Sequence, residues 1–191
     1  MTSVSGALEQ LKEQTLSCRR CGLCEGRTHV VFGTGQPDAG ILLVGEGPGE
    51  QEDLRGEPFV GRSGQLMDKM LEYAGFSRER NLYIANMVKC RPPKNRDPRP
   101  EEVGACIGWL REQTRLIRPK ILVCIGRIAA TYIIDKGFRV TTQHGEFFER
   151  GDMLMMGTFH PAALLRNSAN KPQALDDFLA LRKKADELGL P

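Results

Sequence analysis

The sequence has 191 residues, of which 40% are hydrophobic and 27% charged, and its formal net charge is +3. That length and apolar content suffice for one globular domain with a full core, so we expect residues 1–191 to form a single domain. We expect neither a signal peptide nor a membrane anchor, because residues 1–16 carry charged side chains and no apolar run is long enough to span a bilayer. Six cysteines without a secretion signal favour a reducing compartment, and we expect a cytoplasmic protein that acts as a monomer.

Apolar runs alternate with segments of helical periodicity along the chain. The apolar runs predict strands at 41–44, 82–85, 120–125 and 153–158, the last after a hairpin around 146–152. The periodic segments predict helices at 64–71, 101–117, 127–134 and 173–188. This alternation is typical of an α/β fold, in which helices cover both faces of a parallel sheet.

Four cysteines have the arrangement of a metal site. Cys18 and Cys21 are separated by two residues, so both thiolates can face one metal, and Cys90 and Cys106 follow much later in the chain. Four thiolates suit either zinc or a 4Fe-4S iron–sulfur cluster, and spacing alone does not choose between them. One close pair combined with two single cysteines favours the cluster, with zinc as the alternative.

Two further cysteines are assigned no metal. Cys24 extends the early run, but Cys18 and Cys21 come first, so we treat Cys24 as a spare. Cys124 lies within the apolar run at 121–125, where a free cysteine packs as a small hydrophobic side chain.

A basic, proline-rich segment with the sequence KCRPPKNRDPR runs from residue 89 to residue 99. Its prolines exclude a helix or a central strand, so we predict a stiff exposed loop held between the two later cysteines. An exposed loop with this local excess of positive charge is suited to contacts with nucleic-acid phosphates. The candidate contacts are Lys89, Arg91, Lys94, Arg96 and Arg99.

Distinctive residues follow the predicted strands. A glycine-rich segment at 45–49 follows the first strand, Asn86 follows the second and His160 follows the fourth. Ligands of open α/β sheets bind at the carboxyl ends of the strands, so we expect these residues to surround one site. The glycine-rich segment lacks the patterns of phosphate-binding and dinucleotide-binding loops, and no nucleotide cofactor is predicted.

Four segments, together with the four cysteines, carry a resemblance to a known family. The segments are GEGPGEQED at 45–53, PFVGRSG at 58–64, NMVKCRPP at 86–93 and FHPAALLRN at 159–167. In this order and spacing the chain resembles the family 4 uracil-DNA glycosylases, the iron–sulfur branch of that superfamily. The resemblance implies a three-layer α/β/α sandwich around a four-stranded parallel sheet and the excision of uracil from DNA. It also implies a structural 4Fe-4S cluster, held by Cys18, Cys21, Cys90 and Cys106.

The resemblance implies roles for residues at the strand ends. Phe59 would stack on a uracil flipped out of the DNA, and Asn86 would read the base, because its amide offers an acceptor for N3–H and a donor for O4. His160 would stabilise the negative charge that develops on the departing uracil. Gly47 stands where other families carry a water-activating aspartate, so Glu46 or main-chain carbonyls would orient the water.

Further contacts are expected around the same site. Pro48 is expected beside the base, Leu164 as an apolar wedge in the gap left by the flipped nucleotide, and Arg166 at a phosphate. The expected substrate is uracil-containing DNA, single- or double-stranded. The alternative is a catalytically silent iron–sulfur module of the same fold that binds nucleic acid, although the intact site residues favour an enzyme.

Overall fold

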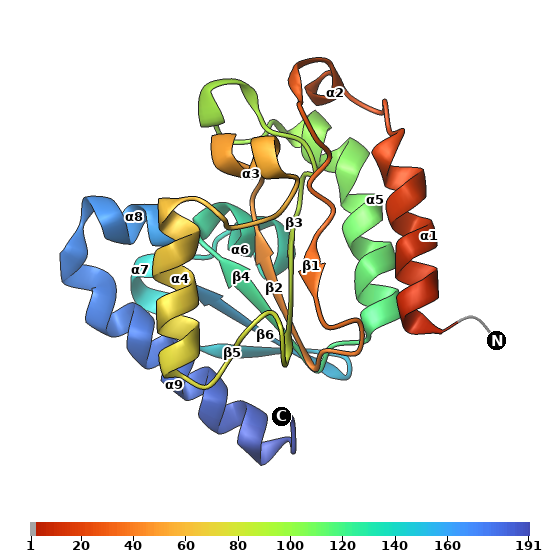
Figure 1. Ribbon diagram of the computed structural model, residues 1–191. Helices are drawn as coiled ribbons and strands as arrows, with labels where there is room; N and C mark the ends of the chain where they lie inside the picture. The colour runs from red at the N-terminus through yellow and green to blue at the C-terminus, as the bar shows by residue number, and fades with distance from the viewer. Residues whose placement is uncertain (1–2) are drawn as a thin grey trace.

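The computed structural model describes residues 3–191, which fold around a six-stranded sheet with the strand order β1-β3-β2-β4-β6-β5 (Figure 1). The inner strands run parallel and are β2 (Ile41–Gly45), β3 (Leu82–Asn86), β4 (Ile121–Ile125) and β6 (Met153–Thr158). Two antiparallel strands, β1 (Thr34–Gly35) and β5 (Phe147–Arg150), form the edges. The sheet is therefore mixed and wider than the predicted four-stranded parallel sheet, because β5 returns beside β6 as a hairpin and the two-residue β1 leaves no apolar run in the sequence.

Side chains of the inner strands alternate between two hydrophobic layers, one on each face of the sheet. In β2, Leu42 and Val44 belong to the first layer, on the first face of the sheet, and Ile41 and Leu43 belong to the second layer, on the second face. Figure 1 shows α1 and α5 on one side of the sheet and α4 and α9 on the other, so helices cover both faces of this α/β fold. The helices of the first face are α1 (Val4–Leu16), α2 (Leu23–Gly26), α5 (Pro100–Ile117) and α6 (Arg127–Ile133). Those of the second face are α4 (Arg62–Tyr73), α8 (Pro161–Arg166) and α9 (Lys171–Glu187).

The structure contains helices that the sequence pattern does not reveal. The prediction assigned no element to the segment of α1, whose Leu8 and Leu11 are buried in the first layer. Helices α3 (Glu50–Arg55) and α8 have six residues each, too few for a helical period to stand out. The remaining short elements are α7 (Val140–Gln143), η1 (Pro93–Asn95) and η2 (Ser168–Asn170). Among residues 3–191, no helix combines the length and apolar character that crossing a membrane requires.

The segments that follow the parallel strands gather at one end of the sheet. The segment after β2 enters α3, whose first turn carries Glu50, Glu52 and Asp53, and carboxylates are favourable at a helix N-terminus. The segments after β3, β4 and β6 lead to η1, α6 and α8. In Figure 1, α3, α8 and the yellow-green segment that contains η1 lie toward the same end of the molecule.

Candidate active site

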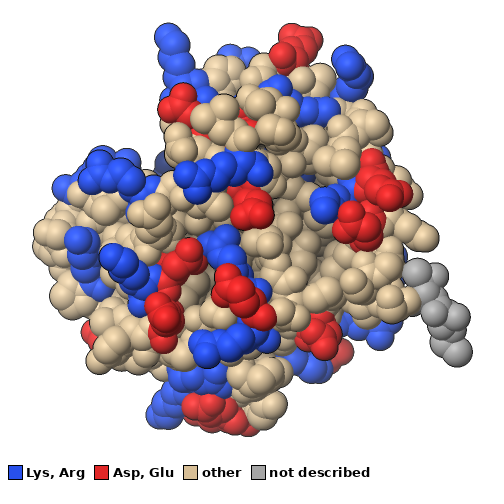
Figure 2. Space-filling view, in the orientation of Figure 1, with Lys and Arg blue, Asp and Glu red and all other residues tan. Residues whose placement is uncertain are grey.

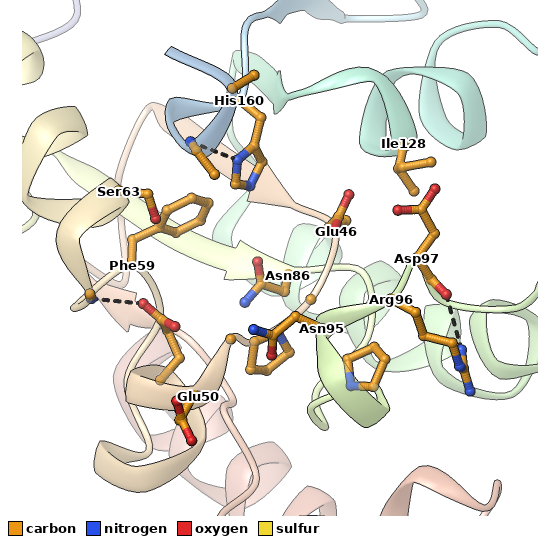
Figure 3. A pocket seen from close by; sticks show the side chains of 18 of the residues that line it. Glu46, Glu50, Phe59, Ser63, Asn86, Asn95, Arg96, Asp97, Ile128 and His160 are labelled. Carbon is orange, nitrogen blue, oxygen red and sulfur yellow. Dashed lines mark hydrogen bonds between the residues drawn. The ribbon is translucent and has the colours of Figure 1, made fainter. Parts of the chain in front are cut away.

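A cavity of ≈ 890 Å³ opens at the carboxyl ends of the parallel strands. Its volume lies within the range of roughly 300–1,000 Å³ found for small-molecule sites, so it has room for a nucleobase together with its sugar. Figure 3 shows Glu46, Phe59, Asn86 and His160 around this cavity. The structure thus brings together residues that lie far apart in the sequence. The predicted site residues that line the cavity are Glu46, Gly47, Pro48, Phe59, Asn86, Arg96, His160 and Arg166.

Phe59 is held in a strained main-chain conformation at the wall of the cavity. Its φ of 54° lies in the left-handed region, which a bulky residue adopts only when its surroundings impose it. On one side the Glu52 carboxylate accepts hydrogen bonds from the two N–H groups that follow Phe59, at 2.9 and 2.8 Å. On the other side Arg78 donates to the Phe59 carbonyl at 3.1 Å. Gly64 completes the fit, because a Cβ there would lie 1.9 Å from the Phe59 carbonyl oxygen.

Asn86 ends β3 on the floor of the cavity, and its side chain is almost fully buried, with 1% exposed. Its Oδ1 atom has no hydrogen-bond partner among the described residues. Only a glycine fits at position 45, since a Cβ there would lie 2.4 Å from Asn86 Oδ1 and 2.6 Å from the Phe59 ring. The amide oxygen and the aromatic ring therefore both pack against Gly45 at the wall of the cavity.

His160 caps the N-terminus of α8 and is neutral at physiological pH. Its Nδ1 accepts a hydrogen bond from the Ala162 main-chain N–H at 3.1 Å, so the ring proton of the neutral imidazole is on Nε2. Burial, together with the nearby Arg166 charge, lowers the pKa of His160 to about 4. The imidazole is thus a neutral N–H donor, and its ring centroid is 6.0 Å from that of Phe59.

Glu46 is a carboxylate whose pKa is raised well above its ordinary value. Burial, together with the negative charge of Asp97, raises the pKa of Glu46 to about 6. Asp97 itself pairs with Arg127 at 3.1 Å across the mouth of the cavity. A carboxylate with a pKa near neutrality, inside a cavity, has the properties of a group that orients or activates water.

Some of the basic side chains of the loop already form hydrogen bonds within the protein. Arg96 forms two hydrogen bonds to the Glu102 carboxylate, at 2.8 and 2.6 Å, and so ties the loop to the first turn of α5. Arg91 donates to Asn95 at 2.7 Å. Lys94 and Arg99 have exposed side chains. Figure 2 shows Lys and Arg side chains interspersed with Asp and Glu on the face seen in Figure 1, so positive charge there is not gathered into one patch.

Lys89 does not lie on the surface of this loop, which corrects its assignment as a DNA contact. Its side chain is 1% exposed, and its ammonium donates to the carbonyls of Phe32 and Asn86 and to Gln113 Oε1, at 3.1, 2.9 and 2.5 Å. Burial lowers the pKa of Lys89 to about 7. All of its acceptors face inward, so the ammonium cannot reach a phosphate.

Leu164 is also buried, which corrects its assignment as a wedge. Its side chain is 2% exposed and packs into the hydrophobic layer beneath α8. The next residue, Leu165, is 43% exposed and lines the cavity. Successive residues of a helix point about 100° apart, so the two leucines face opposite environments.

The predicted metal ligands Cys18, Cys21, Cys90 and Cys106 line one small second cavity, together with Cys24. Three N–H groups point at sulfur atoms of this set. Arg27 donates to Cys90 Sγ at 3.3 Å, the Lys89 main-chain N–H to Cys106 Sγ at 3.3 Å, and Trp109 Nε1 to Cys18 Sγ at 3.4 Å. Such donors favour thiolate sulfur, as the ligands of a metal require.

The cysteine set is nevertheless not in a closed metal-binding geometry. Across residues 3–191, no group of three or more metal-binding side chains is close enough together to hold a metal ion. Burial raises the pKa of Cys106 to about 11 and also raises that of Cys90. Cys124 lies apart, fully buried in β4 as predicted.

Several residues that shape the cavity carry no recognisable signal in the sequence. Glu52 and Arg78 form hydrogen bonds to the main chain around Phe59. In the sequence, Glu52 is marked only by its position among the acidic residues that begin α3. Gly45 appears in the sequence as one of several glycines in a turn. Its importance comes from two side chains that lie far away in the chain.

Two kinds of similarity relate the chain to known proteins. The family model described as the uracil DNA glycosylase superfamily matches residues 32–181. A type-4 uracil-DNA glycosylase of Thermotoga maritima is 43% identical over 166 residues, which cover 86% of each chain. Type-4 uracil-DNA glycosylases of Archaeoglobus fulgidus and Sulfurisphaera tokodaii are each 40% identical, over 95% and 94% of this chain and 93% and 85% of their own lengths. The chain therefore belongs to the uracil DNA glycosylase superfamily and, within it, to the type-4 uracil-DNA glycosylases.

Proposed function

We propose that this uracil-DNA glycosylase binds a uracil extruded from DNA in the large cavity, with Phe59 against the face of the ring and Asn86 at its edge. The observation that carries this proposal is the buried Asn86 Oδ1, which has no hydrogen-bond partner among the described residues. An unpaired buried acceptor costs free energy, so a ligand that supplies a donor there is favoured. The N3–H group of uracil is such a donor, whereas N3 of cytosine is an acceptor and would face the oxygen unfavourably.

The chemistry follows from the charges that develop as the N-glycosidic bond breaks. Uracil leaves with the bonding electrons and becomes an anion, while the sugar becomes positive. The neutral His160 donates its Nε2–H to O2 of the departing base and stabilises the anion. The Glu46 carboxylate orients a water that adds to C1′ of the sugar and passes its proton to that carboxylate. Gly47 offers no side chain for this step, so Glu46 is the group that acts on the water.

DNA is contacted by exposed groups around the cavity. Lys94 and Arg99 on the loop and Arg166 at the cavity are available to phosphates, and Leu165 takes the wedge position in place of Leu164. All of the proposed site residues belong to one chain, and we propose that the enzyme acts as a monomer. The set of thiols supports a reducing compartment, and thus the cytoplasm.

The activity is tested by incubating the protein with an oligonucleotide that contains one uracil. We expect alkali-labile abasic sites at that position, on single-stranded or double-stranded DNA, and none in the matched oligonucleotide with thymine. A catalytically silent DNA-binding module would bind the oligonucleotide and leave it intact.

We expect the excision rate to fall at low pH because the Glu46 carboxylate becomes protonated. Its pKa of about 6 lies above the ordinary value of 4.5, so the required carboxylate is present above pH 6 and is lost as the pH falls through it. The single-turnover excision rate should then fall by about tenfold per pH unit below that point. His160 is protonated only near its own pKa of about 4. Excision rates measured between about pH 4 and pH 7 should show this fall in the parent and not in Glu46→Gln. A fall centred near the His160 pKa in both proteins would assign it to the histidine.

We propose that Cys18, Cys21, Cys90 and Cys106 hold a 4Fe-4S cluster. All of them line one cavity, and the N–H donors aimed at their sulfur atoms fit thiolate ligands. When bound, the cluster supplies a cross-link rather than a reaction step. Cys90 is the second residue of the basic loop, and Cys106 lies on α5, so these ligands would join the loop to the helix and to the segment after α1.

Purified anaerobically, the protein should be brown, with broad absorbance near about 400 nm and bound iron. Cys90→Ser and Cys106→Ser should lose the colour and the iron, because each removes a thiolate ligand. Cys124→Ser is the matched control, since Cys124 is buried in β4 away from the set, and Cys24→Ser tests the choice of ligands. Colourless protein that contains zinc would contradict the cluster.

A further inference from the structure

Lys89 is a fully buried lysine whose hydrogen-bond partners are all neutral. Its side chain is 1% exposed, and its ammonium donates to two main-chain carbonyls and one side-chain amide. Among residues 3–191, no carboxylate forms an ion pair with it. Lysine is almost never buried in this way unless it is paired, because removing an ammonium from water is costly. The cost of this arrangement indicates that the contacts of Lys89 serve the site beside it.

These contacts join three parts of the fold at the floor of the cavity. The ammonium reaches the carbonyl of Asn86 at the end of β3, the carbonyl of Phe32 ahead of β1, and Gln113 on α5. Gln113 also donates to the Phe32 carbonyl at 2.9 Å, so it holds both the ammonium and one of its acceptors. The arrangement fixes where the Asn86 carbonyl lies.

The main chain of Asn86 matters because its side chain has little else to orient it. A carboxamide can turn by half a rotation, which exchanges its acceptor and its donors. The Oδ1 atom of Asn86 has no hydrogen bond to select one orientation. The orientation therefore depends on the position of the main chain and on the close packing against Gly45 and Phe59.

We propose that Lys89 is a positioning residue for uracil recognition, which fixes the Asn86 carbonyl and thereby the orientation of the amide that reads the base. This inference rests on the proposed role of Asn86. It assigns the buried lysine to the reading of the base, and not to DNA phosphates. Gln113 is the partner that keeps the ammonium directed at the Asn86 carbonyl.

The test compares the binding of free uracil with that of 3-methyluracil, which lacks the N3–H that Asn86 accepts. The inhibition constant of 3-methyluracil divided by that of uracil measures how much the contact between N3–H and Asn86 contributes to binding. A general loss of stability weakens both probes alike and leaves the ratio unchanged. In Lys89→Met we expect the ratio to fall by about tenfold, the equivalent of one hydrogen bond, with affinity for uracil-free DNA unchanged. Gln113→Leu, which keeps the lysine and removes one acceptor, should shift the ratio in the same direction by less.

Two further variants make the outcome decisive. Ile84→Val removes one buried methyl group from the same strand and should lower the melting temperature without changing the ratio. Asn86→Ala should bring the ratio close to one. If Asn86→Ala keeps the parental ratio, the proposed reading of the base fails. If the ratio falls close to one in Asn86→Ala but stays parental in Lys89→Met and Gln113→Leu, the reading of the base stands and the role of Lys89 is refuted. Should Lys89→Met fail to fold, Gln113→Leu alone decides, and a parental ratio in that variant refutes the role.

Discussion

Replacing His160 with alanine should slow single-turnover excision of uracil by about 10²–10³-fold, the effect of losing one preorganised donor to a developing anion. The donor is preorganised because Nδ1 is occupied by the Ala162 N–H, which leaves the ring proton on Nε2. It is also neutral, because burial lowers the pKa of His160 to about 4. DNA affinity should change little, since the contact strengthens only as the bond breaks.

Alanine also removes the cap of α8, so a second variant is needed to separate the two effects. Asparagine is among the best N-cap residues and can accept from the Ala162 N–H, but it is too short to replace the imidazole donor. His160→Asn should therefore recover the melting temperature lost in His160→Ala while remaining slow. If His160→Asn regains the parental rate, His160 acts through the helix and not through the departing base.

The parallel strands and the position of the cavity at their ends could be predicted because the responsible signals are local. A run such as Ile121 to Ile125 is apolar throughout, and parallel strands necessarily bring their carboxyl ends together. The short edge strand β1 and the six-residue helices α3 and α8 lack a local signal, because their positions are set by what they pack against.

The errors at the site arise from contacts between distant residues. Lys89 lies in a run of basic residues and looks exposed in the sequence, but Phe32 and Gln113 supply acceptors that hold it inside. Leu164 and Leu165 are identical in type, and only the rotation of α8 against the core decides which is exposed. Glu102 engages Arg96, a pairing that the charge pattern alone does not indicate.

The same dependence on distant contacts makes Gly45 a sensitive test of where uracil binds. In Gly45→Ala the new Cβ would lie 2.4 Å from Asn86 Oδ1 and 2.6 Å from the Phe59 ring, so both groups must move. The main chain itself tolerates alanine, because Gly45 is an ordinary strand residue and does not have a positive φ. We expect single-turnover excision to fall by about 10²-fold, since a displacement of about 1 Å in a reacting site has that cost.

The control for this variant is Gly104→Ala, on α5, where a Cβ meets nothing within 4 Å. It should excise uracil at the parental rate and unfold at the parental temperature or slightly above, because alanine is the better helix former. Both variants should bind uracil-free DNA like the parent, since neither position offers a charged contact. Excision by Gly45→Ala at the parental rate would mean that uracil is not bound between Phe59 and Asn86, and the base would then have to be read elsewhere in the cavity.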